Sequence, residues 1–297
     1  MASFVVFLLL LAQITFVLAA YNPEEDLRLL TAWPVVMSHD AVTGEMDQDR
    51  DGIINDIVDA YTITQGAGLV AQLECGSRAF DYRPYLQKDG TVVGHHGSHV
   101  VKKLLSESLT EVQAWLVERQ ELVLLYLSHW DGEAGVKEAT IKLLQEHNVP
   151  FVEDCSQLSG LTVQQAFLKG KLFAVLDCVD EQYDPEITCY GVGYSCYGHD
   201  KEKAWNKLDA YMAKASSASA SLRMQQAHWQ SSTESVPLGL AHGSSVLKDE
   251  ERAGVNSNLA AQIRGGAYPA AGALNLVELD NVCDGGDQVL AALRLRA

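Results

Sequence analysis

Two histidines follow short apolar segments of the chain and could form an acid–base pair. His39 comes directly after Trp33–Ser38 and precedes Asp40, and His96 ends the segment Thr91–His96. An imidazole titrates near neutral pH and can therefore accept or donate a proton during a reaction. A single histidine in such a place is usually a structural residue of a loop, so the interpretation depends on the residues that accompany the pair.

An aspartate and an arginine lie together at the end of a third apolar segment. Asp81 and Arg83 are two residues apart at the end of Ser77–Tyr82, so on an extended strand their side chains face the same side. A guanidinium can bind two oxygens of a phosphate and stabilise negative charge that develops on it. Two alternatives remain at this point, because the two residues could form an internal ion pair, and two histidines with an aspartate could bind zinc.

Apolar segments that resemble strands alternate with segments of helical spacing. The expected strands are Trp33–Ser38, Ser77–Tyr82, Leu122–Ser128, Leu172–Leu176 and Leu274–Leu279, and the expected helices are Ser106–Arg119, Thr162–Lys169 and Ala204–Lys214. This alternation predicts an α/β fold with parallel strands and crossover helices. No Pro- or Gly-rich linker divides the chain, so we expect a single-domain TIM-type (β/α) barrel, with an open doubly wound sheet as the alternative.

Ionisable residues follow most of these apolar segments. They are His39 and Asp40, Asp81 and Arg83, His95 and His96, His129 and Asp131, Asp177, His228, and Asp280. Because chemistry in such barrels takes place at the carboxyl ends of the strands, we expect several of these side chains to meet in one site.

The first 20 residues resemble an export signal. Residues 1–20 are apolar, carry no charge and end in small residues, which is typical of a signal peptide that precedes a mature domain of residues 21–297. The lack of Lys or Arg near the start leaves an uncleaved anchor as the alternative. A secreted chain could pair all six cysteines, and we expect Cys189 to pair with Cys196.

The charge of the chain limits its partners. The formal net charge is −17 at pH 7, which argues against nucleic acid as a ligand and disfavours tight docking on an anionic membrane. An acidic segment could bind calcium, because Asp47, Asp49, Asp51 and Gly52 have the spacing of a calcium loop. Val58 stands where that loop has its closing glutamate, so a solvated acidic loop is the alternative.

Three segments, in this order and spacing, resemble a known enzyme family. Ser38–Asp40, Gln72–Arg83 and Asp89–Gly97 resemble the X region of phosphatidylinositol-specific phospholipases C, most closely the bacterial, metal-independent branch. The later stretches Leu127–Gly132, Gln226–Ser232 and Val277–Cys283 are similar to secreted phospholipase-C-like phosphodiesterases of eukaryotic microbes. The resemblance implies a distorted TIM-type barrel.

The resemblance also implies a role for each matched residue. His39 would be the general base, His96 the general acid, and Asp280 the carboxylate that orients the base. Asp40 would support the acid, and Arg83 would neutralise the phosphate. A guanidinium at this place stands where calcium-using relatives bind their metal, so we expect no catalytic metal and no cofactor.

Three further residues are expected to contact the substrate, namely Asp81, His129 and Asp177. The bacterial enzymes have basic residues at the strand ends that His129 and Asp177 occupy, so the headgroup of the substrate stays open. His228 is interpreted as a structural histidine of the barrel mouth.

Together these observations predict a secreted phosphoric diester hydrolase that acts on inositol phospholipids, or on their glycosylated derivatives, at a membrane surface. No obligate protein partner is indicated. Two other functions stay open. One is a metal-assisted phosphodiesterase that acts on glycerophosphodiesters or sphingolipids, and the other is a catalytically silent barrel that binds lipid or carbohydrate.

Overall fold

The computed structural model describes residues 22–46, 60–182, 201–215, 221–229, 235–269 and 271–297. Three expectations from the sequence lie outside these residues. They are the signal peptide at 1–20, the calcium loop at Asp47, Asp49 and Asp51, and the pairing of Cys189 with Cys196.

The main sheet has eight strands, and every pair of neighbours is parallel. In sheet order the strands are β10 (Val179–Gln182), β11 (Leu222–Gln226), β12 (Leu276–Leu279), β1 (Val35–Ser38), β2 (Ala79–Tyr82), β6 (Val123–Leu127), β9 (Leu172–Leu176) and β8 (Phe151–Val152). Only Asp177 and Cys178 separate β9 from β10, so one stretch of chain pairs first with β6 and then with β11. The sheet is therefore curled into a distorted TIM-type barrel, as predicted, and is not the open doubly wound sheet of the alternative.

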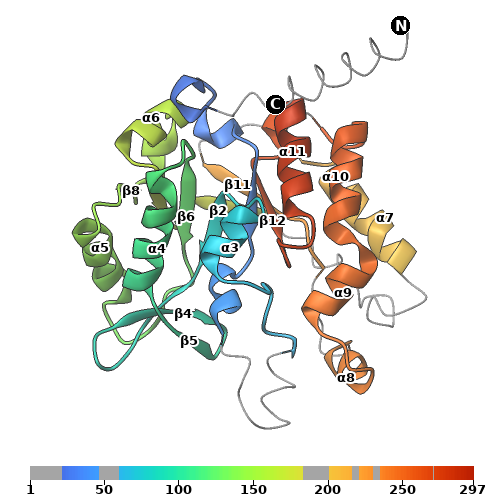
Figure 1. Ribbon diagram of the computed structural model, residues 1–297, viewed down its shortest axis with the longest axis horizontal. Coiled ribbons are helices and arrows are strands. Elements are labelled where there is room, and N and C mark those ends of the chain that lie inside the picture. The colour runs from blue at the N-terminus through green and yellow to red at the C-terminus, as the bar shows by residue number, and fades with distance from the viewer. Residues whose placement is uncertain (1–21, 47–59, 183–200, 216–220, 230–234, 270) are drawn as a thin grey trace, which may run out of the picture.

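Helices cover the outside of this barrel (Figure 1). They are α3 (Leu69–Glu74), α4 (Leu105–Val117), α5 (Val136–Glu146), α6 (Val163–Lys169), α7 (Lys201–Met212), α8 (Ser235–Ala241), α9 (Val246–Ala253), α10 (Val255–Gly265) and α11 (Gly286–Arg296). The three helices expected from the sequence correspond to α4, α6 and α7. Within the described part of the chain, no helix is both long and apolar enough to cross a membrane.

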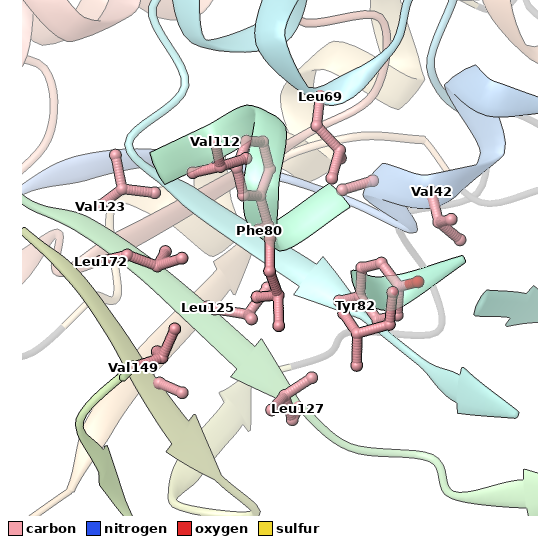
Figure 2. Close-up of a cluster of buried hydrophobic side chains, with 14 of the residues drawn as sticks. Val42, Leu69, Phe80, Tyr82, Val112, Val123, Leu125, Leu127, Val149 and Leu172 are labelled. Atoms are coloured by element: carbon pink, nitrogen blue, oxygen red, sulfur yellow. The ribbon is translucent and has the colours of Figure 1, made fainter. Parts of the chain in front are cut away.

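The central strands are apolar at every position because both of their faces are covered. All residues of β6 and β9 are buried, as expected for parallel strands between a barrel interior and a helix layer. On the outer side, Val112 of α4 packs against Phe80, Leu125 and Leu172 (Figure 2). Each such side chain contributes about 1.5–3 kcal/mol to stability through its burial.

A small second sheet lies at the end of the barrel away from α6 (Figure 1). Its strands, in order, are β5 (His99–Leu104), β4 (Val92–His96), β3 (Pro84–Leu86) and β7 (Asp131–Gly132). Because β3 begins two residues after β2 ends, Arg83 stands between the two sheets, and β4 returns His96 toward it.

Among the described residues, two disulfides link elements of the fold. Cys75, at the end of α3, pairs with Cys283 in the segment after β12. Cys155 pairs with Cys178, the residue that precedes β10.

Candidate active site

A cavity of about 400 Å³ lies at the carboxyl ends of the barrel strands. Of the residues predicted to be catalytic, His39, Arg83, His96 and Asp280 line it, together with Tyr61, Thr64, Glu181, Gln226, Trp229 and Val246. His39 follows β1, Arg83 follows β2, and Asp280 follows β12, so the strand ends place these side chains at one mouth of the barrel.

The register of two strands brings His39 and Asp280 together. Ser38 of β1 pairs with Leu279 of β12, so the next residue on each strand stands beside the other. His39 Nδ1 lies 2.7 Å from Asp280 Oδ1. Because an ionised carboxylate can only accept, Nδ1 carries the hydrogen and Nε2 is the atom left to exchange a proton.

His96 has the same tautomer for a similar reason. Its Nδ1 lies 2.8 Å from the carbonyl oxygen of Thr62, which can only accept a hydrogen bond. The Nε2 atoms of His39 and His96 then lie 3.2 Å and 3.3 Å from the same oxygen, Asp40 Oδ2. The two nitrogens that can exchange protons therefore converge on one buried carboxylate oxygen, beside the cavity that both rings line.

Arg83 is held beside this place by two buried carboxylates. Its Nε lies 2.8 Å from Asp40 Oδ1, and its Nη2 lies 2.9 Å from Asp81 Oδ2. Asp40 has a left-handed backbone with φ of 41°, a conformation that aspartate tolerates better than most residues, and its N–H donates to Asp81 Oδ2. Burial acts to raise the pKa of Asp81, but the charges of Arg83 and His39, together with hydrogen bonds from Arg83 and from the Asp40 N–H, outweigh burial and lower that pKa. The guanidinium is thus a fixed cation.

The charges around His39 favour its protonated form. Burial and the neighbouring His228 act to lower its pKa, whereas the carboxylates of Asp40, Asp280 and Glu278 act to raise it. The carboxylates prevail, and the pKa of His39 is raised above its ordinary value. His39 is therefore a strong proton acceptor once it has lost its own proton.

The chain resembles solved structures of one group of enzymes. Phosphatidylinositol-specific phospholipase C from Staphylococcus aureus matches with a TM-score of 0.62 and 14% identity, over 92% of this chain and 95% of that chain. The enzyme of the same name from Listeria monocytogenes matches with a TM-score of 0.57 and 14% identity, over 91% of this chain and 99% of that chain. No family model and no curated protein sequence matches the chain.

The chain has the fold of these bacterial phospholipases C. At this level of identity the likeness is one of fold, so the chemistry has to be argued from the side chains of the site.

Three residues predicted to bind substrate lie outside the lining of the cavity. Asp81 is buried and orients Arg83 through the contact of its Oδ2 with Arg83 Nη2. His129 is directed to its neighbour, with Nδ1 2.7 Å from Ser128 Oγ. Asp177 accepts hydrogen bonds from Trp130 Nε1 at 2.8 Å and from Lys137 Nζ at 3.0 Å. The structure does not bring His129 and Asp177 into the cluster, and their contact with substrate stays a prediction.

The sequence interpretation missed two features of the site. His228 has a carboxylate partner in Glu278, as expected for a structural histidine. Its ring also stacks on His39, the expected base, and this contact was not predicted. Glu278 is buried beside His228. A signal for Glu278 existed, because it stands two residues before Asp280 and so faces the same side of β12.

Two groups of side chains have the composition of a metal site among the described residues, namely His39 with His228 and Asp280, and His39 with Asp40 and Asp81. In the first group the imidazole rings are stacked with an interplanar angle of 17°. An imidazole binds metal in its own plane, so two stacked rings do not direct their nitrogens at one ion. In the second group Arg83 already bridges the two carboxylates. Neither group is arranged to hold a metal ion.

Proposed function

We propose that the protein is a secreted phosphodiesterase that cleaves the glycerol–phosphate bond of an inositol phospholipid or of its glycosylated derivative. The observation that carries this proposal is the convergence of His39 Nε2 and His96 Nε2 on one place beside the Arg83 guanidinium. A base, an acid and a fixed cation are the groups that an in-line displacement at phosphorus requires. The solved structures with this fold support the choice, because they are named for phosphatidylinositol.

The reaction assigns each proton to a named atom. His39 Nε2 removes the proton of the inositol 2-hydroxyl, and that oxygen attacks phosphorus. The bond from phosphorus to the glycerol oxygen breaks, and His96 Nε2 donates a proton to that oxygen. Diacylglycerol and a cyclic inositol phosphate result. Asp280 holds the Nδ1 hydrogen of His39, Asp40 supports the proton of His96, and Arg83 balances the charge of the phosphate.

The site fits a lipid substrate that carries one phosphodiester. Arg83 is the cation among the described residues that line the cavity, and Glu181 and Asp280 add negative charge there. Together with the net charge of −17, this arrangement disfavours nucleic acid, whose successive phosphates need several cations. The phospholipid at a membrane surface is therefore the partner that we propose.

The test is turnover of phosphatidylinositol by the purified protein, with and without a chelator. We expect cyclic inositol phosphate to form in both conditions. His39→Ala and His96→Ala should each reduce the rate about 100-fold or more, because each removes a proton-transfer group. His147→Ala, at the end of α5, is the matched control and should keep the activity. Loss of turnover in chelator would favour metal-assisted chemistry, and turnover of other phosphodiesters alone would refute the proposed substrate.

A further inference from the structure

His228 and Glu278 form a second imidazole–carboxylate pair behind the first. The ring of His228 lies on the ring of His39, with centroids 4.1 Å apart. His228 Nε2 lies 3.2 Å from Glu278 Oε2, and His228 Nδ1 lies 3.6 Å from Asp280 Oδ2. His228, Glu278 and Asp280 are all at most 2% exposed, so these contacts are shielded from water.

The pairing of β11 with β12 builds this arrangement. Gln226 of β11 is in register with Glu278 of β12. His228 follows Gln226 by two residues, and Asp280 follows Glu278 by two. The side chains of His228 and Asp280 therefore lie at the same level of the barrel mouth. The second pair is thus fixed by the sheet itself.

The consequence is that Asp280 stands between two imidazoles. Its Oδ1 contacts His39 Nδ1 and its Oδ2 faces His228 Nδ1. A carboxylate with a partner at only one oxygen can rotate away, whereas a partner at each oxygen defines the plane of the group. A buried glutamate at the far side of His228 in turn fixes that ring.

We propose that His228, held by Glu278, is a positioning residue that keeps the His39–Asp280 pair in its working geometry. The expected effect on catalysis rests on the proposed function, whereas the effect on the His39–Asp280 hydrogen bond does not. The charged and titratable groups around His39 are Asp40 after β1, Asp81 of β2 and Arg83 after it, His96 of β4, His228 after β11, and Glu278 of β12 with Asp280 after it. Among the residues that the structure describes, His228 is the one that both stacks on His39 and faces Asp280.

Three substitutions at position 228 separate the contacts of this ring. His228→Asn keeps an N–H donor near the place of Nδ1, on the side that faces Asp280. His228→Gln moves the donor to the place of Nε2, toward Glu278. His228→Phe keeps the stacked ring but has no nitrogen. The first readout is the low-field proton resonance of the His39 Nδ1–H that donates to Asp280, and the second is kcat and KM for phosphatidylinositol.

We expect His228→Asn to keep this resonance and to keep kcat within about threefold. His228→Gln and His228→Phe should shift or lose the resonance and lower kcat by about 10–100-fold at nearly constant KM, as small misplacements of catalytic groups do. Equal behaviour of the Asn and Gln variants, or an unchanged resonance in both Gln and Phe variants, would overturn the proposal. If the Phe variant does not fold, the Asn and Gln variants still decide. A wild-type protein with no activity on phosphatidylinositol would refute the proposed function. The resonance of the His39 Nδ1–H in the three variants would still test whether His228 positions the His39–Asp280 pair.

Discussion

The hydrogen bond and the charge of Asp280 act on His39 in different ways. The hydrogen bond from His39 Nδ1 to Asp280 fixes the tautomer of His39, and the charge of Asp280 raises the proton affinity of His39. Burial lowers the pKa of His39, and Asp280 is one of the carboxylates that raise it above the ordinary value. The base is active when neutral, so the acidic limb of the profile of kcat/KM against pH reports this pKa.

Asp280→Asn should therefore move the acidic limb to lower pH. It should also reduce kcat by about 10⁴-fold, as in an enzyme whose histidine took the wrong tautomer after the same change. The measurement is the rate of cyclic inositol phosphate formation from pH 4 to 9. Asp89→Asn, in the exposed turn before β4, is the control and should leave both quantities unchanged. A limb that moves to higher pH would contradict the role given to the charge of Asp280.

Arg83 matters for its shape as well as its charge. Its Nη2 donates a hydrogen bond to Asp81 and its Nε forms an ion pair with Asp40, and a lysine has a single ammonium that cannot span both. We expect Arg83→Lys to lower kcat about 100-fold while the protein stays folded. Arg119→Lys, at an exposed ion pair with Glu74, is the matched control. Wild-type activity in the Arg83→Lys variant would show that any cation suffices.

The main catalytic candidates could be predicted from the sequence because each follows a recognisable strand. His39, Arg83 and Asp280 come directly after apolar segments, and parallel strands bring their carboxyl ends to one place. His228 was expected at the mouth of the barrel, but its contact with His39 could not be predicted, because β11 has the sequence Leu-Arg-Met-Gln-Gln and forms no continuous apolar segment. Asp177 follows β9, but its backbone has φ of 53°, and its side chain binds Trp130 and Lys137.

At the scale of elements, α9 brings a buried acid to the back of the site. Glu250 is 2% exposed, and its Oε1 accepts the backbone N–H of Trp229. Burial first, and then the charge of Asp280, raise the pKa of Glu250 well above its ordinary value. In the unfolded chain the same carboxyl ionises near pH 4.3. As the pH rises above that value, ionisation of Glu250 lowers the free energy of the unfolded state but not that of the folded state. The free energy of unfolding therefore falls.

Glu250→Gln should therefore stabilise the protein, with little effect near pH 4 and a growing effect as the pH rises toward the pKa of the folded state. Glutamine keeps an oxygen for the Trp229 N–H and has no proton to lose. The measurement is urea unfolding at a series of pH values. Glu251→Gln, on the exposed side of the same helix, serves as the control. A gain that is independent of pH would show that ionisation of Glu250 is not the cause.

The elements themselves could be predicted where one pattern repeats over several residues. β1, β2, β6, β9 and β12 lie within the predicted strands, and α4, α6 and α7 match the predicted helices. β8 has only two residues, and β10 has the sequence Val-Asp-Glu-Gln, so neither forms an apolar segment that is visible in the sequence. The capping box of α6 explains its clear start, since Thr162 and Gln165 exchange hydrogen bonds.

At the scale of the whole molecule, the fold tolerates great change in sequence. The similarity to the Staphylococcus aureus enzyme holds at 14% identity, because a barrel requires apolar strands and amphipathic helices in order rather than particular residues. This chain also carries covalent links between its elements. The Cys75–Cys283 disulfide connects α3 with the segment that follows Asp280, whereas Cys155–Cys178 closes a local loop.

The two disulfides should therefore differ in what they contribute to stability. They link residues separated by 208 and 23 positions along the chain, and restricting the longer loop of the unfolded chain contributes about 2 kcal/mol more in the loop-entropy description. We expect the double variant Cys75→Ser with Cys283→Ser to lose more free energy of unfolding, by about that amount, than Cys155→Ser with Cys178→Ser. Urea unfolding of the two variants and the wild-type protein measures the difference. Equal losses, or a larger loss for the shorter loop, would show that contacts in the folded state outweigh the entropy of the unfolded chain.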